Sequence, residues 1–297
     1  KIDGFFSIIP TCTMSSTLKQ NLTKIKKLSY RTSRIDEAYT TKKERCLMKT
    51  RLLLSSLLIA LSTTSFAQTH KAHWSYNGKE SPEHWGDLLT EYQTCKLGKV
   101  QSPVNLEADN GMKVANKPLK MNYFPAEYQV ENNGHTVQVS VAQENAPFIT
   151  LNNKPFYLKQ FHFHTPSEHT FKRQHYPLEI HFVHQSEDKA LAVVAVMVNE
   201  GEANPALAPV VEKKLTVGQK EKLAQQIDIK ALMPKEMARF RLNGSLTTPP
   251  CSENVAWTIF KAPIKASKAQ IAAIEEMEGK NNRPTQPLNQ RDVEVEQ

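Results

Sequence analysis

The chain has 297 residues, enough for one large domain or two small ones, and a formal net charge of +8 from 38 Lys and Arg against 30 Asp and Glu. The excess lies in residues 1–67, which hold 12 of the basic and 4 of the acidic residues and leave 26 of each over residues 68–297. The balanced remainder gives no compositional support for a surface that binds nucleic acid or anionic membranes.

Residues 48–67 have the pattern of a secretory signal peptide. "MKTRLLLSSLLIALSTTSFA" starts with basic residues, continues with an apolar run too short to span a membrane, and ends in small residues. No cysteine directly follows that run, which argues against a lipoprotein anchor. We therefore predict export to the periplasm, with secretion as the alternative, and a mature domain over residues 68–297. Residues 1–47 are interpreted as an upstream extension outside the native protein, with an organelle-targeting leader as the weaker alternative.

Two cysteines, Cys95 and Cys251, follow the predicted signal peptide. An even number of cysteines in an oxidising compartment favours pairing, so we predict a disulfide between them. Two buried free thiols remain the alternative at this point.

From residue 73 onward the expected elements are mostly strands. Residues 73–110 are rich in Trp, Pro, Gly and Asn and predict an irregular segment wrapped on a core. The Asn-Gly pair in "ENNGH" predicts a hairpin turn, because glycine readily adopts positive φ. Apolar alternation predicts strands over 127–130, 136–141, 148–151, 157–164 and 178–184.

The later part of the chain adds two strands and short helices. "ALAVVAVMV" (190–198) is apolar on both faces, which indicates a central buried strand, and residues 255–260 predict another. Helical patterns cover 205–213, 218–226 and 267–278, the last beginning with a serine that can cap it. No repeat or linker interrupts these elements, so we predict one mostly-β domain.

The stretch "KQFHFHTPSEH" holds three of the ten histidines of the chain. Strand alternation places His162 and His164 on one face with Gln160, and Phe161 and Phe163 on the other. Two imidazoles on one strand face are compatible with a metal site and with an ordinary polar surface. The pair alone leaves both interpretations open.

A second strand, "LEIHFVH", offers a third imidazole. Glu179 and His181 share a face, so a carboxylate lies two residues before this histidine, as Gln160 does before His162. Because a metal-ligating histidine usually donates its other N–H to a carboxylate or carbonyl, the repeated pattern supports a three-histidine zinc site with one open position as well as it supports hydrogen-bonded polar histidines, and both interpretations stay open. His184, on the opposite apolar face, is expected to be a buried hydrogen-bonded histidine.

With "QFHFH", "SEHT", "EIHFVH" and "NGSLTTPPCSE" in this order, the chain closely resembles the α-class carbonic anhydrases, from residue 73 to "NNRPTQPLNQR". The short "HTPSEH" connection is similar to the bacterial branch, and the positions of Cys95 and Cys251 match the disulfide of exported members. The resemblance implies a single mainly-β (α+β) domain, with a central, twisted, mostly antiparallel sheet of about ten strands and short peripheral helices.

The resemblance also implies an activity. It is that of a zinc lyase, which converts carbon dioxide reversibly to bicarbonate and a proton by attack of a zinc-bound hydroxide. Zn²⁺ is placed on His162, His164 and His181. Thr247 is implied to orient the hydroxide and to donate its own hydroxyl proton to an ionised Glu168.

Other positions match residues that support this chemistry. His135, in "NNGH", is implied to shuttle protons, since an imidazole with a pKa near 6.5 both accepts and releases them; by sequence alone it is an exposed turn histidine. The residues implied to line the substrate pocket are Val183, Val193, Leu246, Trp257 and Thr248. Those implied to hold the ligands or the proton-carrying waters are Gln160, Glu179, Asn281 and Tyr76.

A non-catalytic binding module on the same fold is the alternative function. Loss of a zinc ligand would favour it, and all three histidines are retained. The implied partners are the small molecules carbon dioxide and bicarbonate, with no nucleic acid and no membrane anchor. Dimers occur in the bacterial branch, so a homodimer stays open.

Overall fold

The computed structural model describes residues 73–107 and 111–297, which lie in one compact unit, Lys71–Gln297. The predicted upstream extension (1–47) and signal peptide (48–67) fall outside these residues. Within the described ranges, no helix is both long and apolar enough to cross a membrane.

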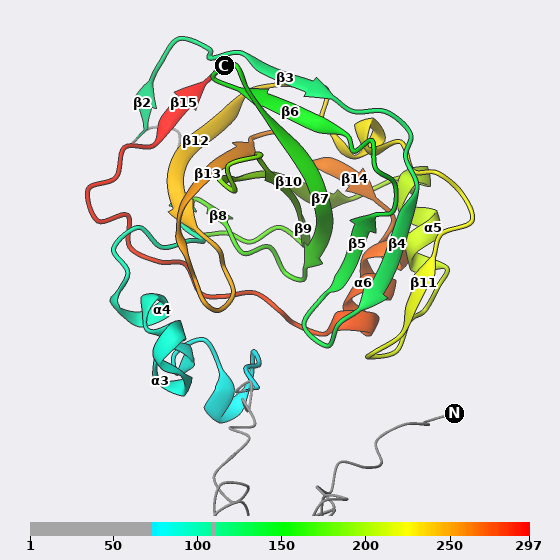
Figure 1. Cartoon of the computed structure of the whole chain (residues 1–297), viewed down its shortest axis with the longest axis horizontal. Coiled ribbons are helices and arrows are strands. Elements are labelled where there is room, and N and C mark those ends of the chain that lie inside the picture. Colours follow the sequence, from blue (N-terminus) through cyan, green and yellow to red (C-terminus); the bar gives the residue numbers. More distant parts are fainter. Residues whose placement is uncertain (1–72, 108–110) are drawn as a thin grey trace, which may run out of the picture. The chain divides into compact units, whose positions relative to one another are not determined.

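A large sheet of thirteen strands dominates the described residues (Figure 1). Most neighbouring strands are antiparallel, and the parallel pairs are β10 with β13, β10 with β14, and β15 with β2. The predicted fold class is confirmed. Along the sheet the main strands are, in spatial order, β11 (Lys220–Lys222), β4 (Tyr128–Asn132), β5 (Val137–Val141), β7 (Lys154–His164), β9 (Leu178–Gln185), β10 (Leu191–Glu200), β13 (Glu253–Phe260), β12 (Arg239–Ser245), β15 (Glu294–Glu296) and β2 (Met112–Lys113).

The remaining strands extend this sheet or lie beside it. Strand β6 pairs with β7 and with β3, and β14 pairs with β10, while β1 and β8 form a separate parallel pair. Their bounds are β3 (Leu119–Asn122), β6 (Phe148–Leu151), β14 (Ile264–Ala266), β1 (Asn105–Leu106) and β8 (Thr170–Phe171).

Strand β10 divides the apolar core in two. Val194 packs in the larger cluster with Phe161, whereas Val193 belongs to a second cluster with Trp257. Because side chains alternate along a strand, each cluster covers one face of the sheet. Residues 192–198 are all buried, as the double-sided apolar pattern predicts.

Two of the predicted helices are present. The predicted helix at 267–278 is α6 (Lys268–Glu278), and Ser267 and Gln270 form a reciprocal capping box at its start. The helix predicted at 205–213 is a short turn, η3 (Pro205–Leu207), continued by α5 (Ala208–Val211).

The helix predicted at 218–226 is wrong. This segment contains β11, which pairs with β4 at the edge of the sheet, so that Lys220 lies opposite Glu131. Ion pairs of 2.9 Å between Lys220 and Glu131, and of 2.8 Å between Lys222 and Glu127, accompany the pairing. The free edge of β4 and these opposite charges outweigh the helix propensity of "KEK".

The segment from residue 73 to 107 consists of short turns around one buried ring. The indole N–H of Trp85 donates to the carbonyls of Ser75 and Glu80, and a disulfide joins Cys95 to Cys251, as predicted. The short helices here and before β12 are η1 (Gly78–Glu80), α3 (Trp85–Leu88), η2 (Thr90–Tyr92), α4 (Thr94–Leu97) and η4 (Ile229–Leu232).

Candidate metal centre

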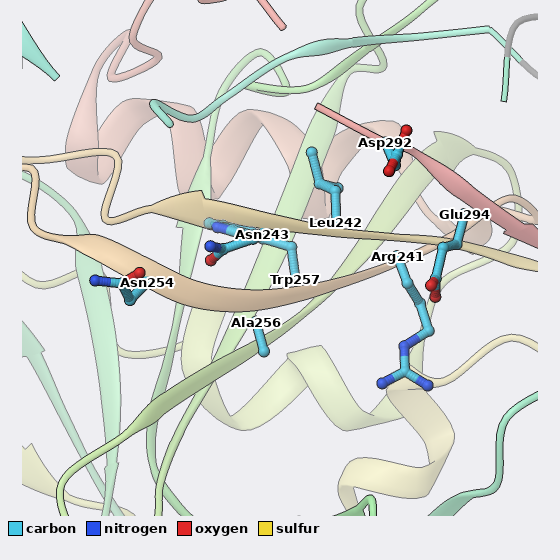
Figure 2. Close-up of a pocket in the computed structure, with 8 residues that line it drawn as sticks. All are labelled: Arg241, Leu242, Asn243, Asn254, Ala256, Trp257, Asp292 and Glu294. Carbon is cyan, nitrogen blue, oxygen red and sulfur yellow. The ribbon is translucent and has the colours of Figure 1, made fainter. Parts of the chain in front are cut away.

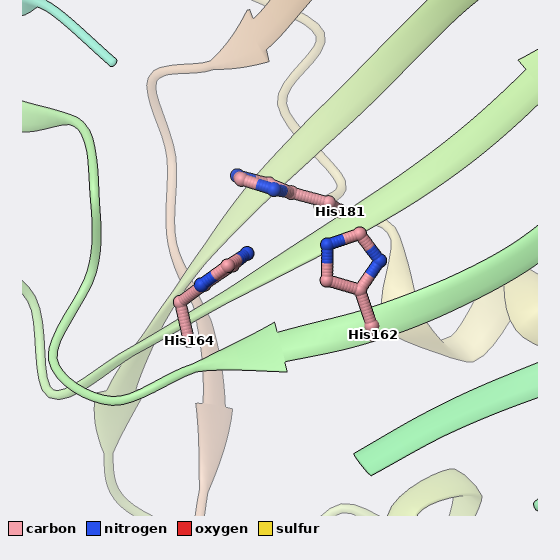
Figure 3. Close-up of side chains that lie close together, drawn as sticks. All are labelled: His162, His164 and His181. Carbon is pink, nitrogen blue, oxygen red and sulfur yellow. The ribbon is translucent and has the colours of Figure 1, made fainter. Parts of the chain in front are cut away.

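Three histidines converge on the face of the sheet where β7 and β9 pair. The antiparallel register sets His162 opposite His181, and His164 lies two residues farther along β7 (Figure 3). Each of the three offers one ring nitrogen that lies within 4.8 Å of the other two. The structure therefore brings together the three imidazoles that the sequence predicts as ligands.

The second nitrogen of each ring is held by a hydrogen-bond acceptor at 2.8 Å. Gln160 Oε1 accepts from His162 Nδ1, Glu179 Oε1 accepts from His181 Nε2, and the backbone carbonyl of Asn281 accepts from His164 Nδ1. These bonds set the tautomers and leave His162 Nε2, His164 Nε2 and His181 Nδ1 as lone-pair donors. His164 Nε2 is buried and has no hydrogen-bond partner among the described residues.

The electrostatics of the cluster suit a cation. Burial, followed by the neighbouring imidazoles, holds the pKa of His162 well below its usual value, and burial also lowers the pKa of His164. Burial opposes charge on His181 as well, but Glu179 and then Glu168 outweigh it and raise the pKa of His181. Two neutral rings and a nearby carboxylate are therefore available to a positive ion.

Glu179 serves two histidines and a turn. Its Oε1 accepts from His181 and from His169 Nδ1, each at 2.8 Å, and its Oε2 accepts from the backbone N–H of Glu168 and His169. Burial favours the neutral acid, but His169 and His181 keep the pKa of Glu179 well below its usual range. An ionised Glu179 therefore fixes His181 and the chain at Glu168 together.

Glu168 lies beside the cluster, but not in the contact predicted for it. Its Oε1 accepts from the backbone N–H of Arg283 at 2.9 Å, and its Oε2 lies 3.4 Å from His164 Nε2 and 3.9 Å from His181 Nδ1. The predicted hydrogen bond from Thr247 is absent, because Oε2 turns toward the imidazoles and has no hydrogen-bond partner among the described residues. Thr247 itself is buried.

A pocket opens from the histidines toward His135. Its lining includes His162, His164, Tyr76 and Thr248 as well as His135. Burial, followed by the charges of Glu168 and Glu278, raises the pKa of Tyr76 well above its usual value, so its phenol stays protonated. Burial and then nearby His73 lower the pKa of His135. The pocket thus joins three predicted site residues, Tyr76, His135 and Thr248, to the cluster, and we call these three residues the rim of the site.

An apolar wall stands next to His181. Val193 and Trp257 are buried in the second core cluster, and Val183 and Leu246 pack against the same cluster. The Trp257 ring meets the His181 ring edge-on, with centroids 4.9 Å apart. The four predicted pocket residues therefore belong to or pack against one apolar cluster, which contacts His181 through Trp257.

Comparison with known proteins decides the family. A family model described as eukaryotic-type carbonic anhydrase matches residues 80–297. This chain belongs to the α-carbonic anhydrase family. A carbonic anhydrase of Klebsiella pneumoniae is 44% identical over 254 residues, which cover 83% of this chain and 99% of that protein.

Two solved structures extend the likeness to the fold. The α-carbonic anhydrase of Thermovibrio ammonificans, in complex with the inhibitor sulfanilamide, is 43% identical with a TM-score of 0.72, and the match covers 75% of this chain and 99% of that one. A dioscorin complexed with ascorbate is 32% identical with a TM-score of 0.71 and coverages of 75% and 97%.

Membership has direct consequences for this chain. It is an enzyme that hydrates carbon dioxide, and its substrates are the small molecules carbon dioxide and bicarbonate. Carbonic anhydrases of this type carry zinc on three histidines, and the present cluster has the corresponding donor set. A disulfide such as Cys95–Cys251 is typical of exported proteins.

One pocket of this carbonic anhydrase lies apart from the chemistry. It is formed on β12, β13 and the chain before β15, and its lining includes Arg241, Asn243, Asp292 and Glu294 (Figure 2). Of the predicted site residues only Trp257 borders it. It contains none of the three histidines, so we do not assign the carbonic anhydrase site to it.

Sequence reasoning missed a buried arginine behind the site. The Arg283 guanidinium donates to Gln101 Oε1, to the carbonyl of Ser102 and to the carbonyl of Cys95, while its backbone N–H holds Glu168. It thereby connects the disulfide-linked segment to the carboxylate beside the histidines. The only signal for it is its place in "NNRPTQPLNQR".

Proposed function

We propose that this enzyme binds Zn²⁺ through His162 Nε2, His164 Nε2 and His181 Nδ1 and hydrates carbon dioxide in the pocket beside them. The observation that carries the proposal is the orientation of the three rings. Each has one nitrogen bound to an acceptor at 2.8 Å, and each contributes a nitrogen to a group within 4.8 Å. A protein surface without a ligand has no need for this arrangement.

The donor set fits zinc in kind as well as in number. Three imidazoles are a standard ligand set of catalytic zinc, and a metal would satisfy the buried His164 Nε2. When bound, zinc lowers the pKa of a coordinated water to about 7, for which carbonic anhydrase is itself the standard example, and so supplies a nucleophile at neutral pH.

Thr247 and Glu168 are proposed to orient the attacking oxygen. Glu168 Oε2 faces the imidazoles and has no hydrogen-bond partner among the described residues, so it can accept the Thr247 hydroxyl proton only after it turns away from them. A hydroxyl that donates to Glu168 has only its lone pairs left for the attacking oxygen, which sets that oxygen's direction. The Thr247 backbone N–H can then stabilise the developing negative charge.

The apolar wall is proposed to hold the substrate. Carbon dioxide carries no net charge or dipole, so Val183, Val193, Leu246 and Trp257 can bind it without leaving a polar group unsatisfied. Thr248 lines the pocket that holds His162 and His164, and we propose that bicarbonate leaves through this pocket.

His135 is proposed to carry the released proton to solvent. Its lowered pKa keeps the ring neutral at pH 7, so it can accept a proton from the pocket. The protonated Tyr76 phenol lines the same path and can order water between the histidines and the rim. We further propose that the enzyme acts in the periplasm, after cleavage of residues 48–67.

Stopped-flow carbon dioxide hydration, with and without a chelator, tests this proposal. We expect the chelator to abolish activity, added Zn²⁺ to restore it, and His162→Ala to remain inactive with either. His84→Ala is the matched control, because His84 is exposed and its side chain caps no helix. A folded wild-type protein that does not hydrate carbon dioxide would instead support the non-catalytic binding module, and hydration that persists in metal-free protein would refute the zinc site.

A further inference from the structure

The carboxyl group of Glu278 has a position that helix stability does not explain. Glu278 is the last residue of α6, no basic residue lies in that turn, and burial raises the pKa of its carboxyl group well above the usual value. The described residues contain no ion pair to it. A residue that conflicts with its local setting in this way invites a search for what it binds.

Its two oxygens reach inward to the strands that carry the site. Oε2 accepts from the Thr136 hydroxyl and from the backbone N–H of Val137, each at 3.0 Å, and Oε1 accepts from the Thr165 hydroxyl at 3.3 Å. Thr136 and Val137 directly follow His135, and Thr165 directly follows His164. One carboxyl group therefore links the proposed proton carrier to a proposed zinc ligand.

Further hydrogen bonds join the turn that carries His135 to the end of α6 and the residues after it. Asn132, which starts the turn before His135, donates to the carbonyl of Met277 at 2.6 Å. Asn281 donates to the His135 carbonyl at 3.1 Å, while its own carbonyl accepts from His164. The turn that carries His135 is thus attached to the end of α6 on both sides of that histidine.

The hydrogen-bond inventory shows what Glu278 supplies. The single hydroxyl proton of Thr136 has two acceptors, the Phe163 carbonyl at 2.8 Å and Glu278 Oε2 at 3.0 Å. Val137 N–H needs an acceptor in either case. At the other oxygen, the single hydroxyl proton of Thr165 can be given to the Gly279 carbonyl at 2.9 Å instead of to Oε1 at 3.3 Å. A glutamine can therefore accept from Val137 with its oxygen at the Oε2 position and donate to the Thr165 hydroxyl with its NH₂ at the Oε1 position. Glutamine should thus replace Glu278, whereas alanine and the shorter aspartate should not.

We propose that Glu278 is a positioning residue for proton transfer, which holds the His135 turn at a fixed offset from the metal-binding strand. This inference rests on the proposed function, because it requires His135 to carry protons. It assigns Glu278 no contact with substrate. Its loss should slow the proton-transfer step and leave the hydration step unchanged.

The test compares Glu278→Ala, Glu278→Asp and Glu278→Gln with wild type and His135→Ala in a series of buffer concentrations. At low buffer we expect kcat of the alanine and aspartate variants to fall about threefold to tenfold, with kcat/KM within about twofold of wild type. Imidazole should restore kcat, and Glu278→Gln should behave as wild type. Glu276→Ala, on the exposed side of α6, is the control.

Each other result overturns the inference. A wild-type kcat in both Glu278→Ala and Glu278→Asp would show that the His135 turn needs no carboxyl group, and a parallel fall in kcat/KM would show a role in the metal site instead. If the alanine variant does not fold, the aspartate variant decides. An inactive wild type refutes the proposed function itself, whereas an active wild type with an unaffected His135→Ala refutes the proton path and this inference alone.

Discussion

The histidine cluster and the rim that carries His135 are built in opposite ways. The cluster lies on two paired strands, and an acceptor at 2.8 Å fixes every ring. His135 follows a turn, stacks on Trp74 with ring centroids 3.7 Å apart, and its Nδ1 has no hydrogen-bond partner among the described residues. A metal needs fixed donors, whereas a proton carrier needs a ring that can face both pocket and solvent.

Removal of one fixed ring gives the largest expected effect. His181→Ala leaves two donors, which is too few for a stable catalytic zinc site, so we expect loss of zinc on dialysis and a fall in kcat/KM on the order of a thousandfold. Metal analysis and stopped-flow hydration measure the two effects. Full zinc content in this variant would show that the third ring is not a ligand.

Loosening a fixed ring should cost less than removing it. Glu179→Gln replaces the ionised acceptor of His181 with a neutral one, and we expect zinc affinity to fall about 10- to 100-fold. Competition with a chromophoric chelator measures this affinity. Glu187→Gln, at an exposed position, should match wild type. Equal affinities for both variants would contradict the role of Glu179.

At the rim, substitution should affect turnover and spare the metal. For His135→Ala we expect about a tenfold lower kcat at low buffer, an unchanged zinc content and recovery with imidazole. The same stopped-flow assay, run across buffer concentrations, checks this. A fall in zinc content would mean that rim and cluster are not separate regions.

His184, on the opposite face of β9 from His181, should affect stability at low pH but not activity. His184 bonds Tyr123 at 3.0 Å, and burial lowers the pKa of His184 to about 3. Below about pH 6.5 the His184 imidazole is protonated in the unfolded chain but stays neutral in the folded chain. The free energy of unfolding therefore falls by up to about 1.4 kcal/mol per pH unit toward pH 3.

The test of this residue is the slope of stability against pH. Urea unfolding between pH 7 and pH 4 should show a shallower loss for His184→Gln than for wild type, with hydration at pH 7 retained. Identical slopes would show that other groups carry the acid sensitivity.

Much of the fold could be predicted because apolar and polar residues alternate along a strand that buries one of its faces. The strands predicted over 157–164 and 178–184 lie in β7 and β9, and all but the first residue of the strand predicted over 190–198 lies in β10. The prediction failed at 218–226, where the edge of β4 decides the structure, and β12 was missed. The run "RFRLNGS" in β12 contains Asn and Gly and forms a strand through its partners β13 and β15.

In the site, too, contacts between residues close in sequence could be predicted, and contacts between distant residues could not be predicted from spacing. Gln160 and Glu179 stand two residues before the histidines they hold, so spacing alone predicts those contacts. Asn281 lies 117 residues from His164, and only the family resemblance pointed to it. Glu278 had no signal of either kind, because its partners come from strands that are distant in sequence.

The parallel pairing of β10 with β13 bears on how the enzyme matures. Val193 and Trp257 are direct partners in that pair, so the apolar wall exists only after two segments far apart in sequence have joined. The nearer contact of β7 with β9 is enough to bring the three histidines together, although the ring of His164 is fixed only when Asn281 arrives. Since long-range pairing is slow, we expect the β7–β9 pair to form before the β10–β13 pair. A folding chain should therefore bind its metal before its binding surface for carbon dioxide is complete.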